Sequence, residues 1–118
     1  MIISLDCPYP PGVNTYYRTF QGRMLLSKRG REYKKIVADI VSADCTTKFG
    51  NARLKVHINF YPNSKRKVDL DGRLKSLLDA LQDAGVMDDD EQIDDLRIVR
   101  CAMLPGGRAT VMIEAIHG

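Results

Sequence analysis

A stripe of leucines in the second half of the chain is the feature that most restricts its fold. The stripe consists of Leu70, Leu74, Leu77, Leu78 and Leu81. This spacing places the five side chains on one face of an α-helix. Gly85 follows where a helix-ending glycine is expected, and Val86 is placed for the hydrophobic contact that accompanies such an end. A helix over this segment must pack its leucine face against another element.

The segment before the stripe alternates between apolar and polar residues, as a half-buried β-strand does. Its apolar members are Leu54, Val56, Ile58 and Phe60, and its polar members are Lys55, His57, Asn59 and Tyr61. Residues 53–61 are therefore predicted to form a strand whose polar face is open to water or to a ligand.

The N-terminal part of the chain predicts a strand, a loop and a helix. Residues 1–6 contain the short apolar run of a strand, and the prolines within residues 8–11 then exclude a helix. Residues 12–27 interleave tyrosines with arginines. By composition alone, a loop that covers the edge of the core explains them better than a base-stacking surface. Ser27 is a suitable N-cap for a helix whose apolar stripe runs from Tyr33 to Val41.

Two further strands are predicted at the end of the chain. Residues 96–103 and 109–116 are apolar enough for strands, and a Pro-Gly-Gly turn at 105–107 lies between them. We expect these two strands to pair as a β-hairpin. The order β-α-β-α-β-β then predicts an α+β fold, with a small mixed sheet and helices packed on one side, in a single domain over residues 1–118.

Charge is unevenly distributed along the chain. Residues 1–68 carry 13 Lys and Arg against 4 Asp and Glu, whereas residues 69–95 carry 2 against 10. A basic body around one acidic segment suits an enzyme that acts on nucleic acid, because basic groups hold phosphates and clustered carboxylates hold a metal ion. A solvated acidic helix that follows a basic strand explains the same charges about equally well.

The acidic segment offers ligands for a divalent cation. Asp69 and Asp71 point the same way if the chain is extended there, and two such carboxylates repel each other unless a cation lies between them. Magnesium prefers oxygen ligands and commonly uses one or two carboxylates together with a substrate phosphate. Lys75 lies one helical turn after Asp71, where it can stabilise charge on a phosphate. The run 88–90 supplies a third carboxylate if the chain folds back.

Each of these signals also has a simpler explanation. Asp71 can be a helix cap, and three consecutive aspartates are commonly a solvated turn. Their combination with Lys75 and the basic run 65–67 favours metal-dependent hydrolysis of phosphodiester bonds. The alternatives are a non-catalytic, structure-specific DNA-binding protein that uses the same basic surface, and a small nucleotide phosphohydrolase.

Other patterns narrow the possibilities further. Cys7, Cys45 and Cys101 are scattered, which fits reduced, buried thiols better than a zinc site or a disulfide framework. His57 and His117 are too isolated for a histidine metal site. No apolar run is long enough to span a membrane, and the pattern of a signal peptide is missing, so we expect a cytoplasmic protein.

A series of short motifs runs through nearly the whole chain. It comprises Pro10-Pro11, Asn14, Tyr17-Arg18, Gly22-Arg23, Ser27, Asp69-Leu70-Asp71, Lys75, Asp79-Ala80-Leu81, Ala84-Gly85, Asp89-Asp90 and Gly106-Gly107-Arg108. Any one fragment is a weak signal, whereas the ordered set is specific. In this order the motifs resemble those of the RusA family of Holliday junction resolvases, which are small endonucleases of bacteria and their phages.

The resemblance implies a homodimer that binds four-way DNA junctions and nicks two opposed strands with magnesium. By position, Asp69 and Asp71 are similar to the first two metal-binding catalytic acids. Lys75 is similar to the catalytic lysine. The third acid falls on Asp90, and Asp89 is the alternative if the alignment slips by one residue. Two nicks require two such sites, and a two-fold pair of chains matches the symmetry of the junction.

The expected DNA contacts come from basic residues around the acids and in residues 12–27. They are Arg18, Arg23, Lys65, Arg66, Lys67 and Arg73. The chain departs from the family at two neighbouring positions. Gly72 stands where the family often has an asparagine after the second acid, and Val68 stands where a basic residue often precedes the first. Both departures concern phosphate contacts rather than the acids.

Overall fold

The computed structural model describes residues 2–44, 48–65 and 70–116. Its main sheet contains β1 (Ile2–Cys7), β4 (Leu54–Tyr61), β5 (Ile93–Arg100) and β6 (Arg108–Ala115). A second, two-stranded sheet contains β2 (Tyr17–Phe20) and β3 (Arg23–Leu26). The helices are α1 (Val13–Tyr16), α2 (Lys28–Asp44), α3 (Leu70–Asp83) and the short 3-10 helix η1 (Asp90–Gln92).

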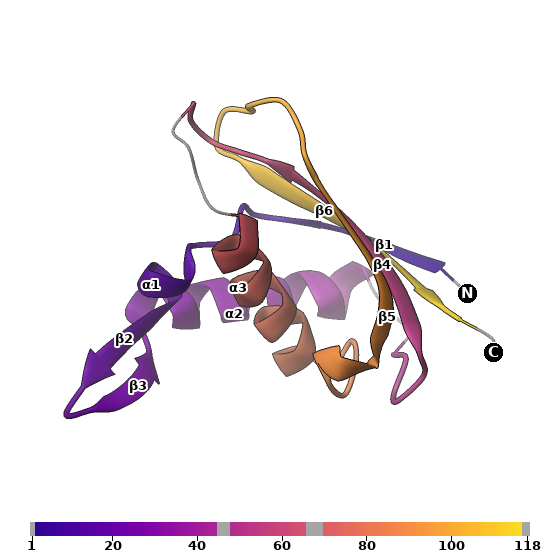
Figure 1. Cartoon of the computed structure of the whole chain (residues 1–118), viewed down its shortest axis with the longest axis horizontal. Helices are drawn as coiled ribbons and strands as arrows, with labels where there is room; N and C mark the ends of the chain where they lie inside the picture. The colour runs from indigo at the N-terminus through magenta and orange to yellow at the C-terminus, as the bar shows by residue number, and fades with distance from the viewer. Residues whose placement is uncertain (1, 45–47, 66–69, 117–118) are drawn as a thin grey trace.

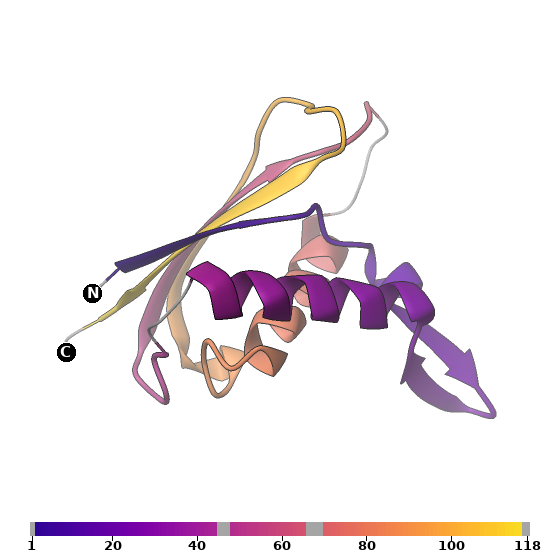
Figure 2. The ribbon, with the colours of Figure 1, turned by 180° about the vertical axis from the view of Figure 1, so that it is seen from behind.

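The main sheet is mixed and has the strand order β1-β6-β4-β5. β6 pairs antiparallel with both β1 and β4, whereas β4 and β5 are parallel. A parallel pair requires a crossover connection, and α3 provides it. Figure 1 shows α2 and α3 on the same side of the sheet, and Figure 2 shows the two helices crossing each other. The predicted α+β fold, with a mixed sheet and helices on one side, is confirmed.

The core lies between the main sheet and the two long helices. The alternation predicted for β4 is confirmed, because its four apolar side chains are at most 1% exposed. Leu77 and Leu81 of the leucine stripe are fully buried. Gly85 ends the helix with a φ of 86°, and the Val86 N–H donates to the Leu81 carbonyl over 3.2 Å. This is the helix end that the sequence predicted.

The predicted hairpin of the last two strands is wrong. β4 lies between β5 and β6, so the two strands are not neighbours. Their connection passes over the end of β4, where the Cys101 N–H donates to the Phe60 carbonyl over 2.7 Å and the Leu104 N–H donates to the Pro62 carbonyl over 2.8 Å. In β6 buried residues alternate with more exposed ones, as expected of a strand in the middle of the sheet. In β5 most residues are exposed and several are charged, as expected of an edge strand.

Residues 12–27 are more regular than the predicted loop. They form α1 and then the β2–β3 hairpin, whose turn residues Gln21 and Gly22 have φ values of 50° and 72°. Positive φ at both positions is typical of the two-residue turns that join tightly paired strands. The hairpin projects away from the main sheet (Figure 1). The predicted N-cap at Ser27 is confirmed, because its Oγ accepts a hydrogen bond from the Gly30 N–H over 3.0 Å.

The prediction of buried thiols is confirmed for Cys7, whereas Cys101 is partly exposed. Cys7 and Cys101 are free cysteines, and burial is the main cause that raises the pKa of Cys7 to about 12, with the charge of Asp6 adding to it. Cys45 and His117 lie outside the described residues. Within the described residues, no helix is both long enough and apolar enough to cross a membrane.

Candidate active site and nucleic-acid interface

One face of α3 carries a row of charged side chains. Asp71 lies in the first turn, and Lys75 and Asp79 follow at four-residue intervals, which places the three on one side of the helix. Asp71 and Lys75 are exposed, and Asp79 is partly buried. The leucine face packs into the core, so this row borders solvent. From Asp71 to Asp79 the helix rises by about 12 Å.

Asp89 and Asp90 lie beside the C-terminal end of α3. The Asp90 N–H donates to Oε1 of Gln82, in the last turn of α3, over 3.1 Å. The Asp89 carboxylate accepts the N–H of Glu91 over 2.9 Å and caps η1. The chain therefore folds back to α3 after Gly85, as the prediction of a third carboxylate required.

Gln92 holds the aspartate run in place, a role that was not predicted from the sequence. Its side chain is almost fully buried, and its Nε2 donates to the carbonyls of Gly50 (2.9 Å) and Ala52 (2.6 Å). Its Oε1 accepts the N–H groups of Asp88 (3.0 Å) and Asp89 (2.9 Å). The aspartates are therefore part of an ordered turn that is fixed to the segment before β4.

Two carboxyl groups, those of Asp89 and Asp79, lie near enough to Asp90 to affect its pKa. Loss of contact with water raises the pKa of Asp90, and a hydrogen bond with Asp89 together with the negative charges of Asp89 and Asp79 raises it further. The three carboxylates repel one another when all are ionised, because they carry the same charge. A bound cation would relieve the repulsion, and carboxylate oxygens are ligands that a divalent cation such as magnesium prefers.

Asp79 also joins three helices. The hydroxyl of Tyr16, which is fully buried, donates to Oδ2 of Asp79 over 2.6 Å. Nζ of Lys34 lies 3.4 Å from the same oxygen and 3.6 Å from Oδ1 of Asp83. These contacts fix α1 and α2 to α3 beside Asp90. No role was predicted for Asp79, although its spacing of four residues from Lys75 places it on the same side of the helix as Asp71 and Lys75.

The structure does not bring all the predicted acids together. Asp69 lies outside the described residues. Asp90 lies beside Gln82, whereas Asp71 lies at the opposite end of α3. Within the described parts of the chain, no group of three or more His, Cys, Asp or Glu residues is close enough to hold a metal ion.

The predicted DNA-binding residues lie in different environments. Arg18 and Arg23 are exposed on the β2–β3 hairpin, and Lys65 is exposed in the segment that follows β4. Arg18 Cζ lies 5.8 Å from the ring centroid of Phe20, which is 52% exposed. The hairpin thus presents cationic and apolar groups together, as a nucleic-acid surface does.

The other three predicted DNA-binding residues differ from these. Arg66 and Lys67 lie outside the described residues. Arg73 is partly buried, and its Nη1 donates to the Pro10 carbonyl over 2.7 Å. Its guanidinium is therefore already engaged within the protein.

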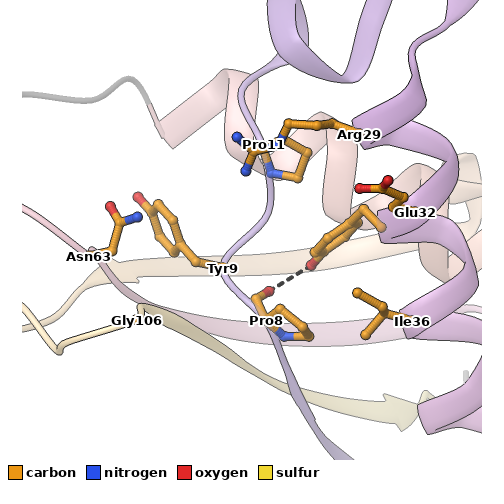
Figure 3. Close-up of a pocket in the computed structure, with 9 residues that line it drawn as sticks. Pro8, Tyr9, Pro11, Arg29, Glu32, Ile36, Asn63 and Gly106 are labelled. Atoms are coloured by element: carbon orange, nitrogen blue, oxygen red, sulfur yellow. Dashed lines mark hydrogen bonds between the residues drawn. The ribbon is translucent and has the colours of Figure 1, made fainter.

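A pocket of about 250 Å³ lies between the proline-rich loop and α2 (Figure 3). The Tyr33 hydroxyl donates to the Pro8 carbonyl over 2.8 Å inside it. The residues that line this pocket include Arg29 and Glu32. Asp71, Lys75 and Asp90 are not among them. This pocket is therefore separate from the row of charged side chains along α3.

Comparison with known proteins gives a consistent set of matches. A model of the family described as Endodeoxyribonuclease RusA matches residues 8–114. The chain is 42% identical over 111 residues to the crossover junction endodeoxyribonuclease rusA of Enterobacteria phage HK97, covering 93% of this chain and 92% of that protein. It is 36% identical over 111 residues to the enzyme of the same name from Escherichia coli K12, with the same coverage. For the corresponding protein of Enterobacteria phage 82 the identity is 35% over 109 residues, covering 92% and 91%.

Proposed function

The chain belongs to the RusA family of endodeoxyribonucleases, and we propose on this basis that it cuts four-way DNA junctions by metal-dependent hydrolysis. The observation that carries the proposal is its similarity to crossover junction endodeoxyribonucleases over more than nine-tenths of both chains. Because the family is one of endonucleases, it favours neither of the two alternative functions, a non-catalytic DNA-binding protein and a nucleotide phosphohydrolase. The relatives come from bacteria and their phages, so we propose that the protein acts in the bacterial cytoplasm.

Asp69, Asp71 and Asp90 are proposed as magnesium ligands. Asp71 and Asp90 lie at opposite ends of α3 within one chain, so Asp90 is not assigned to the same ion as Asp71. Asp90 is preferred to Asp89 because the Asp89 carboxylate already accepts the Glu91 N–H as a helix cap. The raised pKa of Asp90, which burial causes first and neighbouring carboxyl groups increase, also supports a cation at this position. When bound, magnesium would polarise the scissile phosphate and promote deprotonation of an attacking water.

Lys75 is proposed to bind an oxygen of the phosphate that is cut. It is exposed and lies one turn after Asp71. In the described part of the chain, no carboxylate lies within ion-pairing distance of it. Its ammonium group is therefore available to stabilise the negative charge that develops during hydrolysis.

Cleavage of labelled junctions tests the proposed function. A four-way junction labelled on each strand in turn should receive nicks at symmetric positions in two opposed strands, while a linear duplex of the same sequence stays intact. Free nucleotides should not be hydrolysed. Equal cutting of the duplex, or no cutting by folded protein in magnesium, would contradict the proposal.

A homodimer is proposed because two nicks require two sites, and a two-fold pair of chains matches the symmetry of the junction. Sedimentation equilibrium, without DNA and then with it, measures the number of chains. Two chains on each junction are expected. One chain per junction that still makes both nicks would contradict the dimer.

The hairpin arginines should contribute to the affinity for DNA. We expect the double variant Arg18→Gln/Arg23→Gln to bind the junction more weakly, because each arginine that neutralises a phosphate releases counterions. The slope of log Kd against log salt concentration should decrease by about 2, or roughly one for each contact. Fluorescence anisotropy at several salt concentrations measures this. Thr19→Ala, on the same exposed strand, is the uncharged control, and an unchanged slope in the double variant would remove the hairpin from the interface.

A further inference from the structure

The guanidinium of Arg73 contacts other residues of the protein. Besides donating to the Pro10 carbonyl over 2.7 Å, its guanidinium Cζ lies 5.0 Å from the ring centroid of Tyr9. A Cβ added at Gly12 would lie 3.8 Å from the same Cζ. The loop between β1 and α1 thus encloses the guanidinium. An arginine placed in this way gains a hydrogen bond and a cation–π contact at once.

Tyr9 connects Arg73 to the core. Its ring meets that of Phe60 edge to face, with centroids 5.9 Å apart and an interplanar angle of 87°. Phe60 is fully buried near the end of β4. The Tyr9 hydroxyl is buried without a hydrogen-bond partner among the described residues, so the ring rather than the hydroxyl makes these contacts. Figure 3 shows Tyr9 on the proline-rich loop, turned towards Asn63.

These contacts, which we call the Tyr9–Arg73 clamp, join the two elements on either side of the proposed site. Phe60 lies near the end of β4, and Arg73 lies in the first turns of α3, between Asp71 and Lys75. The segment that connects β4 to α3 contains Asp69. The clamp therefore fixes the start of the helix that carries Asp71 and Lys75 with respect to the sheet.

We propose that Arg73 is a positioning residue of the endonuclease, which acts through the clamp rather than by binding DNA. The catalytic part of this proposal rests on the proposed function. A displacement of about 1 Å at reacting groups can reduce a rate on the order of a hundredfold, so a small shift of α3 is enough to affect cleavage. This replaces the expectation that Arg73 holds the DNA backbone.

Four variants test the clamp. Arg73→Met removes the charge and the donor but keeps most of the side-chain volume, and Tyr9→Leu removes the ring. We expect each to lower the single-turnover cleavage rate by about 10- to 100-fold, while junction affinity measured without metal is unchanged. The double variant should be no slower than the slower single variant, because both changes break one interaction. Tyr9→Phe retains the ring and should keep the wild-type rate.

Two results would overturn the proposal. If Arg73 binds a phosphate, Arg73→Met weakens junction binding and lowers the salt slope by about one, while Tyr9→Leu does neither. If the two residues act independently, their effects on cleavage multiply in the double variant.

Amide hydrogen exchange in residues 74–78, whose N–H groups donate to carbonyls in the first turns of α3, gives a measurement that does not depend on cleavage. Exchange in this first part of α3 should be faster in Arg73→Met and Tyr9→Leu than in the wild type and in Tyr9→Phe. Unchanged exchange would overturn the clamp. A wild-type chain that cuts no junction would instead overturn the proposed function, and the exchange measurement would still decide the structural role of Arg73.

Discussion

Asp71→Asn is expected to abolish junction cleavage and to leave junction binding intact. The substitution removes a negative ligand from the proposed metal site but leaves the basic surface unchanged. A metal ion contributes several kcal/mol to stabilising the transition state, and about 1.4 kcal/mol corresponds to a tenfold change in rate, so we expect a loss on the order of a thousandfold. Single-turnover cleavage in magnesium and a gel shift without metal measure the two properties separately.

Asp39→Asn is the matched control for this variant. It makes the same chemical change on the exposed surface of α2, where Asp39 pairs with Lys35 over 3.5 Å. Its cleavage rate should equal that of the wild type. Undiminished cleavage by Asp71→Asn would show that the carboxylate at the start of α3 is not a metal ligand.

Lys75→Ala is expected to reduce the cleavage rate by about 10²- to 10³-fold, the range seen when one group that stabilises transition-state charge is removed. The unfolding midpoint in urea should not change, because Lys75 is exposed and has no ion-pair partner in the described part of the chain. Rates at saturating protein isolate the chemical step from DNA binding.

Lys35→Ala provides the control for the loss of one exposed lysine. Lys35 is 78% exposed on α2, in an ion pair with Asp39. Lys75→Arg tests the geometry of the charge, because a planar guanidinium does not reproduce a compact ammonium group. If Lys75→Ala cuts junctions at the wild-type rate, the residue belongs to the general surface rather than to the site.

Elements with a strong local pattern were predictable from the sequence. The strand over β4, the helix with the leucine stripe and the helix end at Gly85 follow from periodicity and backbone preferences within a few residues. The hairpin prediction failed because strand pairing is not local. The Pro-Gly-Gly sequence indicates a turn, but no local pattern near it indicates that β4 pairs with both β5 and β6.

The candidate site shows the same division. Helix spacing alone placed Lys75 one turn after Asp71, and the family resemblance selected Asp90. Three contacts of the site join residues that are far apart in the sequence. Gln92 contacts Ala52, 40 positions away. Tyr16 contacts Asp79, and Arg73 contacts Pro10, each 63 positions away. Such partners depend on the fold as a whole, so the sequence indicated the type of side chain but not its role. Arg73 is the clearest case, because a basic residue beside the acids suggested DNA binding and the structure shows it bound within the protein.

Cleavage of a four-way junction with and without magnesium tests the central claim most directly. With magnesium, the chain should make paired nicks in opposed strands. With a chelator in its place, cleavage should stop while the gel shift of the junction persists, because the basic surface does not depend on the metal. Cleavage that continues at the same rate in the chelator would contradict a metal-dependent junction endonuclease.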